Sequence, residues 1–326
     1  MAAEPLLSVR GLRVTFAAPR GLLTAVDGID FDVQAGEVLG VAGESGSGKS
    51  VTLRSLLRLV KPPGHVDGQV VWRGCDILSM PEADVRDIRG REIAMIFQEP
   101  MTALNPVLTV GTQIRKSLAE HTQLDAGQRK ARAVELLDLV GIPSAKSRSE
   151  DYPHQFSGGM RQRAMIAIAL AAKPRLLLAD EPTTALDVTI QDQILKLLLR
   201  LRRELQMSVI LVTHDLGVIA QTCDRLVVMY AGQVVETGPV AALFARPRHA
   251  YTLGLLNSVP RAGAIRQPLA SIPGQPPSLL DLPTGCAFAP RCRFVTAACS
   301  TARPPLVEVA PGHLSACLRH RDVAAA

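Results

Sequence analysis

The feature that most constrains this chain is an apolar run that leads into a glycine-rich loop and then into a helical pattern. Residues 38–42 are apolar or glycine, and leucine or valine at 53, 56, 57 and 60 follows at helical spacing. The loop between them reads Gly43, Glu44, Ser45, Gly46, Ser47, Gly48, Lys49, Ser50. It fits G-x-x-x-x-G-K-[ST] in full, which predicts a buried strand, a phosphate-binding loop and a helix.

The chemistry of phosphate binding explains this spacing. Glycines let successive backbone N–H groups turn inward around phosphate oxygens, and the following helix offers its positive end. We expect Lys49 to reach the β- and γ-phosphates and the Ser50 hydroxyl to ligate Mg²⁺.

A second apolar run, residues 176–179, ends in the adjacent acids Asp180 and Glu181. An acid at the carboxyl end of a strand beside a phosphate loop is where a Mg²⁺-binding carboxylate belongs. We therefore expect Asp180 to hold the metal through its water shell. Glu181, one residue further, is predicted to polarise the attacking water as general base.

Apolar patterns elsewhere predict strands that alternate with helices. The predicted strands are residues 6–16, 24–33, 38–42, 93–97, 176–179 and 209–212, and helical spacing covers 128–140 and 190–205. This alternation predicts an α/β fold with a mostly parallel sheet. The α/β domain is expected to end near residue 240, and prolines break any periodicity beyond about residue 258.

Net charge, aromatic content and the length of the apolar runs limit which partners and which cellular location we expect. A net charge of +6 invites a nucleic-acid interpretation, but only 3% of residues are aromatic, which leaves little to stack on bases. We expect no nucleic-acid partner. No apolar run reaches the roughly 20 residues that span a bilayer, and the start of the chain lacks a signal pattern. We expect a cytosolic protein that docks on a membrane.

The segment that distinguishes among phosphate-loop ATPases precedes the acid pair. It reads Phe156, Ser157, Gly158, Gly159, Met160. This segment resembles the Leu-Ser-Gly-Gly-Gln signature of ABC ATPases, with Phe156 and Met160 as departures. A serine that caps a helix opened by glycines describes the same residues in structural terms. In the family the serine hydroxyl and the glycine amides face phosphate.

Other residues resemble the family pattern in order and spacing. Gln98 matches the glutamine that senses Mg²⁺ and the attacking water, and His214 matches the switch histidine that contacts the γ-phosphate. The segment 185–187, which ends in Asp187, matches the loop that crosses the dimer interface. Phe16 falls where the family stacks an aromatic ring on adenine; a core role is its alternative.

The resemblance implies an ABC-type nucleotide-binding domain over residues 6–258. Such a domain has a mostly parallel sheet, an antiparallel β subdomain and a helical subdomain, here at about residues 100–160. It also implies that one subunit is half a catalyst, because ATP and Mg²⁺ lie between the phosphate loop of one subunit and the signature of a second ABC ATPase subunit. The proline-rich, cysteine-containing extension would cover residues 259–326.

Four cysteines lie in this extension, which we expect to be a small irregular module. They are Cys286, Cys292, Cys299 and Cys317, separated by five, six and seventeen residues. Structural zinc usually brings a pair spaced by two to four residues, so an iron–sulfur cluster suits this spacing better; zinc and unliganded thiols stay open. Cys75 and Cys223 are most simply small buried residues.

Residues 271–280 and 285–292 resemble the carboxyl-terminal extension of oligopeptide and dipeptide importer ATPases. Residues 249–252, which read His-Ala-Tyr-Thr, resemble the His-Pro-Tyr-Thr that opens that extension. In some members of the family the cysteines hold a [4Fe–4S] cluster.

The resemblance implies the ATPase of a peptide importer on the cytoplasmic side of the inner membrane. Its expected partners are two integral-membrane permease subunits, a partner ATPase and, indirectly, an extracytoplasmic solute-binding protein. One alternative is a soluble, non-transport ABC ATPase. The other is an importer of the same family that carries nickel or another solute.

Overall fold

The computed structural model describes residues 4–19, 21–184, 186–258 and 271–326. The chain divides into two compact units: the first combines Met1–Ser79 with Val212–Ala326, and the second is Met80–Leu211. Across the described residues, no helix has both the length and the apolar character that a membrane span requires. The predicted boundary at residues 258 and 259 stays a prediction, since 259–270, with Pro260 and Pro268, lie outside the described residues.

An antiparallel sheet with the order β2-β1-β4-β5 forms one part of the first unit. Its strands are β1 (Leu7–Ala18), β2 (Gly21–Val33), β4 (Gly64–Trp72) and β5 (Cys75–Asp76). Val14 of β1 lies opposite Val26 on one neighbour and Val66 on the other. The strands predicted at 6–16 and 24–33 are present and extend into a hairpin.

The first unit also contains strands in the order β11-β12-β10-β9-β3. They are β3 (Val38–Ala42), β9 (Arg225–Tyr230), β10 (Gln233–Pro239), β11 (Val307–Ala310) and β12 (His313–Ser315). β3 and β9 are parallel, while β9, β10, β12 and β11 pair antiparallel. Every residue of β3 is buried, as its apolar sequence predicts.

Short helices accompany these strands. They are α1 (Lys49–Leu56), α9 (Leu216–Thr222), α10 (Val240–Ala245), α11 (Ala250–Asn257) and α12 (His320–Val323), with 3₁₀ turns at Ala289–Arg291 and Ala297–Ser300. A core cluster that includes Tyr230, Tyr251, Phe288 and Val323 joins α11 and α12 to β9.

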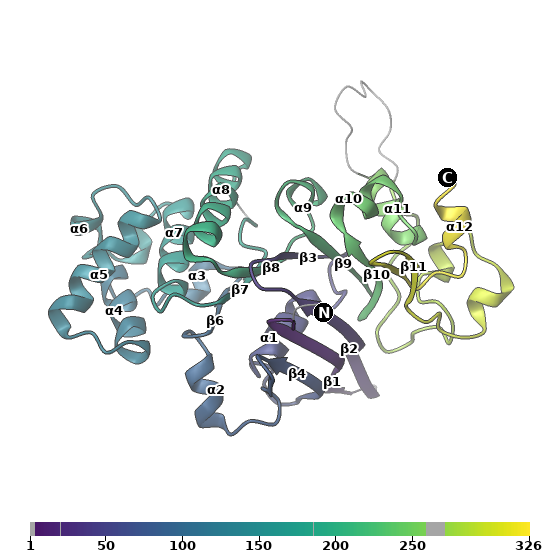
Figure 1. The fold of residues 1–326 in the computed structure, drawn as a ribbon, viewed down its shortest axis with the longest axis horizontal. Coiled ribbons are helices and arrows are strands. Elements are labelled where there is room, and N and C mark those ends of the chain that lie inside the picture. Colours follow the sequence, from purple (N-terminus) through teal and green to yellow (C-terminus); the bar gives the residue numbers. More distant parts are fainter. Residues whose placement is uncertain (1–3, 20, 185, 259–270) are drawn as a thin grey trace. The chain divides into compact units, whose positions relative to one another are not determined.

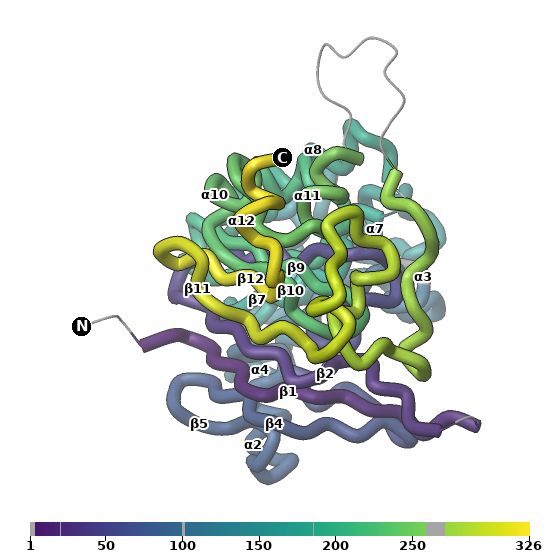
Figure 2. The backbone as a smooth tube through the Cα atoms, turned by 90° about the vertical axis from the view of Figure 1, so that its right-hand side faces the viewer, coloured from purple at the N-terminus to yellow at the C-terminus, as the bar shows by residue number. Residues whose placement is uncertain are grey.

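The C-terminal extension is built into the first unit rather than forming a separate irregular module. Thr237 of β10 pairs with Leu314 of β12, and β11 follows at the edge (Figures 1 and 2). The extension thereby covers backbone groups of β10 that would otherwise form an open sheet edge. The prediction of an irregular module is correct only for the turns and loops around the cysteines.

The second unit combines strands in the order β8-β7-β6 with a set of helices. The strands are β6 (Ile93–Ile96), β7 (Leu176–Asp180) and β8 (Ser208–Val212), and β6 and β7 pair in parallel. The helices are α2 (Glu82–Ile88), α3 (Pro100–Ala103), α4 (Val110–His121), α5 (Ala126–Leu139), α6 (Ala145–Arg148), α7 (Gly158–Ala169) and α8 (Val188–Leu205), with a 3₁₀ turn at Pro153–Gln155.

The helices of the second unit follow local sequence signals. Asp125 and Gln128 form a capping box at the start of α5, which satisfies two backbone N–H groups. The buried residues of α8, among them Ile194 and Leu201, follow one stripe of the helix. The strands predicted at 93–97, 176–179 and 209–212 and the helices predicted at 128–140 and 190–205 are all present.

Candidate active site

The phosphate loop joins β3 to α1, as its sequence predicts. Gly48 has a φ of 98° and directly precedes α1; a Cβ there would lie 2.5 Å from the carbonyl oxygen of Ala25. Only glycine fits both this backbone conformation and this close approach. Gly43 is equally constrained, because a Cβ would collide with the carbonyl oxygen of Met229.

Lys49 lies beneath the loop. Its side chain is buried, and its Nζ donates hydrogen bonds of 2.8 Å to the carbonyl oxygens of Gly43 and of Glu44. The Ser50 side chain follows in the first turn of α1. A positive charge at the base of a glycine-rich loop and at a helix N-terminus suits a ligand that carries several phosphates.

Two further predicted residues lie in the first unit. Phe16 is half-buried on β1, opposite Gly64 of β4. His214 is exposed between β8 and α9. The next residue, Asp215, caps α9, since its Oδ1 accepts a 2.7 Å hydrogen bond from the Gly217 N–H.

The acid pair lies at the carboxyl end of β7 in the second unit. Asp180 is fully buried, and Glu181 adopts a left-handed backbone with a φ of 47°. The Glu181 Oε2 accepts hydrogen bonds from Gln98 Nε2 at 3.3 Å and from Thr184 Oγ1 at 2.7 Å. The structure thus brings together Gln98 and Glu181, which are 83 positions apart. A non-glycine residue in this backbone region is held there by its surroundings, as is common at functional sites.

The signature residues open α7 in the second unit. Ser157 is exposed and its hydroxyl accepts a 3.3 Å hydrogen bond from the Met160 N–H, so the serine is the N-cap. Gly158 is also exposed, while Gly159 is half-buried. The structural interpretation of this serine as a helix cap is therefore correct, and the exposed face leaves room for a contact outside this chain.

Asp187 is the N-cap of α8, as Ser157 is of α7. Its Oδ1 accepts a 2.9 Å hydrogen bond from the Ile190 N–H. Of the loop predicted at 185–187, Ala185 lies outside the described residues.

The four cysteines of the extension line one cavity of about 20 Å³. They are Cys286, Cys292, Cys299 and Cys317. Burial raises the pKa of the Cys286, Cys292 and Cys317 thiols, which favours the protonated form. Four soft sulfur donors around one cavity have the chemistry of a cluster site. In the part of the chain that the structure describes, however, no three His, Cys, Asp or Glu side chains are arranged as metal ligands.

The other two cysteines differ from each other. Cys223 is partly buried, and burial raises the pKa of its thiol to about 12. Cys75 is exposed, so its prediction as a buried residue is wrong. It lies on β5, a two-residue strand at the sheet edge, where its side chain is not covered.

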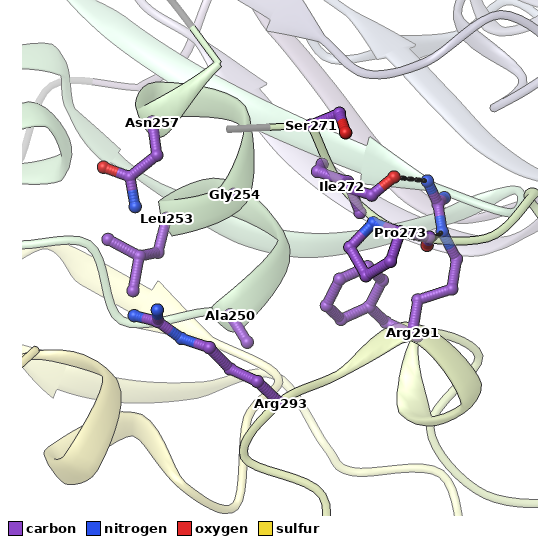
Figure 3. Close-up of a pocket in the computed structure, with 10 residues that line it drawn as sticks. Ala250, Leu253, Gly254, Asn257, Ser271, Ile272, Pro273, Arg291 and Arg293 are labelled. Atoms are coloured by element: carbon purple, nitrogen blue, oxygen red, sulfur yellow. Dashed lines mark hydrogen bonds between the residues drawn. The ribbon is translucent and has the colours of Figure 1, made fainter. Parts of the chain in front are cut away.

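One set of contacts at the phosphate loop has no counterpart in the predictions. Arg291 of the extension forms an ion pair with Glu44 of the loop, and the Tyr251 hydroxyl accepts a hydrogen bond from the Glu44 N–H. Figure 3 shows Arg291 beside Ile272 and Pro273, at the rim of a cavity of about 170 Å³ next to α11. The one sequence signal was the acid itself, because a carboxylate inside a phosphate-binding loop repels phosphate less when a cation lies nearby.

Comparisons with known proteins agree with these features. Residues 26–184 match the family model described as ABC transporter, and residues 235–299 match that described as oligopeptide/dipeptide transporter, C-terminal region. The chain is 49% identical to the oligopeptide transport ATP-binding protein OppD of Escherichia coli (strain K12), over 97% of this chain and 94% of that protein. It is 48% identical to OppD of Haemophilus influenzae, over 96% and 97% of the two chains.

Among solved structures, the chain resembles the ATP-binding cassette MJ0796, solved as a dimer in a post-hydrolysis state bound to ADP and Pi. The TM-score is 0.65 at 28% sequence identity, and the match covers 72% of this chain and 98% of that one. The arrangement of mixed parallel and antiparallel sheets with helices is therefore that of an ATP-binding cassette.

Proposed function

Because the chain belongs to the ABC transporter family and is an ATPase of that family, we propose that it energises the import of peptides across the cytoplasmic membrane. The observation that carries this proposal is the match of residues 235–299 to the C-terminal region of oligopeptide/dipeptide transporters. That region lies outside the phosphate loop, the acid pair and the signature residues, so it separates peptide importers from ABC ATPases with other tasks. The identity of 49% to an oligopeptide transport protein over nearly the whole chain supports the same assignment.

The phosphate loop is proposed to bind ATP through its backbone and through Lys49. The loop residues are Gly43, Glu44, Ser45, Gly46, Ser47, Gly48, Lys49 and Ser50. Phe16, half-buried at the end of β1, is proposed to stack on adenine. Mg²⁺ prefers hard oxygen ligands, and the Ser50 hydroxyl and the buried Asp180 carboxylate supply that chemistry. When bound, the metal would neutralise charge on the phosphates.

Glu181 is proposed as the general base for hydrolysis. Gln98 and Thr184 both donate to its Oε2, which fixes the direction of the carboxylate. Gln98 would share the attacking water and report the state of the site to a membrane partner. His214, exposed after β8, would contact the γ-phosphate.

A second ABC ATPase subunit is proposed to complete each site. Ser157 and Gly158 are exposed at the positive end of α7, which is suited to a phosphate brought by another chain. Gly159 and Asp187 would lie at the same interface. Val188, next to Asp187, is 83% exposed, as expected of an apolar side chain that a partner covers.

Two integral-membrane permease subunits are the proposed membrane partners, with an extracytoplasmic solute-binding protein acting indirectly. The second unit exposes Phe97, Val107 and Tyr152, which are large apolar or aromatic side chains. Phe97 directly precedes Gln98, so a permease segment seated there would touch the residue proposed to sense the nucleotide. The protein would then be peripheral, on the cytoplasmic side of the inner membrane.

The four cysteines around one cavity are proposed to hold a [4Fe–4S] cluster. Such a cluster would cross-link the segments of the extension through its thiolate ligands. Protein prepared without oxygen should then be brown and contain iron and sulfide in equal amounts. Colourless protein with stoichiometric zinc would assign the cysteines to zinc instead.

A pull-down from the native membrane in mild detergent tests the import function. The tagged chain should bring down two multi-spanning proteins and a second ATPase, identified by mass spectrometry. The accompanying binding protein can then be tested with dipeptides, longer peptides and nickel chelates, which decides the transported solute. Recovery from the soluble fraction alone, without membrane proteins, would contradict the import function and leave an ATPase.

A further inference from the structure

Glu44 is the one acid in the phosphate loop. A carboxylate in a loop that receives a polyphosphate repels its ligand, unless a cation neutralises it. The cation here comes from the C-terminal extension, 247 positions along the chain. Arg291 Nη1 lies 2.7 Å from Glu44 Oε2 and Nη2 lies 3.0 Å from Oε1, a bidentate pair.

Arg291 is held firmly in this orientation. Its side chain is only 5% exposed, against 26% for Glu44. Its Nε donates to the Pro273 carbonyl at 2.9 Å, and Nη1 also donates to the Tyr230 hydroxyl at 3.2 Å. The guanidinium carbon lies 5.8 Å from the ring centres of Tyr230 and Phe288. These contacts fix the guanidinium before any ligand arrives.

The remaining polar groups of Glu44 are also engaged. Its N–H donates to the Tyr251 hydroxyl at 2.7 Å, and its carbonyl accepts from Lys49 Nζ at 2.8 Å. Tyr251 itself is fully buried, with its ring 4.6 Å from that of Tyr230. Of the three tyrosines in the chain, Tyr251 accepts a hydrogen bond from Glu44 and Tyr230 accepts one from Arg291, the partner of Glu44.

The residues that surround Glu44 come from α11 and the extension, outside the strand–loop–helix that forms the phosphate loop. The pairing depends on Arg291, since Arg291 alone supplies a positive side chain to the Glu44 carboxylate among the ion pairs of the described residues. Loss of Arg291 would leave a negative charge at the edge of the phosphate loop and one end of the loop less constrained.

We propose that Arg291 is a positioning residue for ATP: it neutralises Glu44 and fixes the phosphate loop, so that the C-terminal extension sets the affinity of the site for nucleotide. Arg291 acts through Glu44 and need not touch the nucleotide itself. The proposal requires ATP binding by this chain and is independent of which solute the complex transports.

Binding of Mg·AMP-PNP, a non-hydrolysable ATP analogue, to the full-length chain tests this role. Arg291→Ala should weaken binding about tenfold, the effect of roughly one uncompensated charge near the site. Arg291→Lys keeps the charge but not the bidentate geometry, so its loss should be smaller, about threefold. Arg293→Ala is the matched control, because Arg293 stacks on Phe294 and makes no contact with Glu44 in the described structure.

The decisive variant is the double substitution Arg291→Ala with Glu44→Gln. Removing the unpaired charge should restore binding to within about threefold of wild type, whereas a packing defect would persist. Glu44→Gln alone keeps the extension intact and should bind at least as tightly as wild type. In the assembled complex, Arg291→Ala should raise KM for ATP while kcat changes less than about twofold.

Two outcomes would overturn the proposal. One is an unchanged affinity in a folded Arg291→Ala protein; the other is an equal loss in the single and double variants. If Arg291→Ala does not fold, weakened binding by Glu44→Gln would overturn it as well. Lys49→Ala should not bind Mg·AMP-PNP and gives the baseline for absent binding. A wild-type chain that also fails to bind would instead contradict the ATPase function.

Discussion

Acidification should destabilise the first unit through His249. This histidine directly precedes α11, and its Nδ1 accepts a 3.1 Å hydrogen bond from the Tyr251 N–H. Its ring is buried and lies near Phe288, while the backbone N–H of His249 donates to the buried carboxylate of Glu236 at 3.0 Å. Burial lowers the pKa of His249 to about 4, against an ordinary value of 6.5. Glu236 opposes this shift without cancelling it.

The sign follows from proton binding. Between pH 6.5 and 4 the unfolded chain protonates this histidine and the folded chain does not, so stability falls as the pH falls. The cost is negligible at pH 7.5 and reaches about 2 kcal/mol at pH 5.0, from the two pKa values of His249. Protonation would also remove the acceptor that caps α11.

Urea unfolding at pH 7.5 and pH 5.0 measures this effect, with His249→Asn as the comparison. Asparagine can cap the helix through its side-chain oxygen but does not titrate. The wild type should lose about 2 kcal/mol more free energy of unfolding than His249→Asn over this range. Because all other titrating groups are common to both proteins, losses equal to within about 0.5 kcal/mol would refute the assigned pKa and its cause.

Three further substitutions test separate parts of the molecule. Lys49→Ala should abolish ATP binding, measured by calorimetry; retained micromolar affinity would contradict the role of Lys49. Glu181→Gln should leave ATP binding intact and lower kcat by about 10²–10⁴, the usual contribution of a general base; steady turnover in the assembled complex would remove Glu181 from that role. Glu236→Ala should lower the free energy of unfolding by about 3–5 kcal/mol, because it leaves His313, the buried His249 N–H and the partly buried Arg248 N–H without their acceptor. A change below about 1 kcal/mol would show that water replaces it.

Local patterns in the sequence predicted most of the fold. The strand–loop–helix around Lys49 follows from glycine geometry and the apolar run before it, and α8 follows from its apolar stripe. The helical subdomain predicted at about residues 100–160 contains α4, but the bounds of this helix were not predicted, although Val110, Ile114 and Leu118 are buried along it. Their spacing of four is compatible with one face of a helix or of a strand, and the Thr109 cap is the local signal that favours the helix.

These local patterns did not predict which strands pair over long distances in the sequence. β11 and β12 are strands of four and three residues, and β12 pairs with β10 across about 80 positions. Strands this short carry little periodicity, so their partner is set by the open edge of β10 rather than by their own sequence. The left-handed backbone of Glu181 is likewise imposed by its surroundings and leaves no mark on residue type.

The cysteines of the extension are connected to the nucleotide site through a residue that neighbours one of them in the chain. The residues that reach Glu44 are Tyr251, at the start of α11, and Arg291, the immediate neighbour of Cys292. The cysteines themselves face a cavity that does not include Glu44. Any change at the cysteines, whether a ligand or oxidation, would therefore reach the phosphate loop through the backbone that Cys292 shares with Arg291. The substitutions of Arg291 and Glu44 that test nucleotide affinity test the last step of this path, from Arg291 to the phosphate loop.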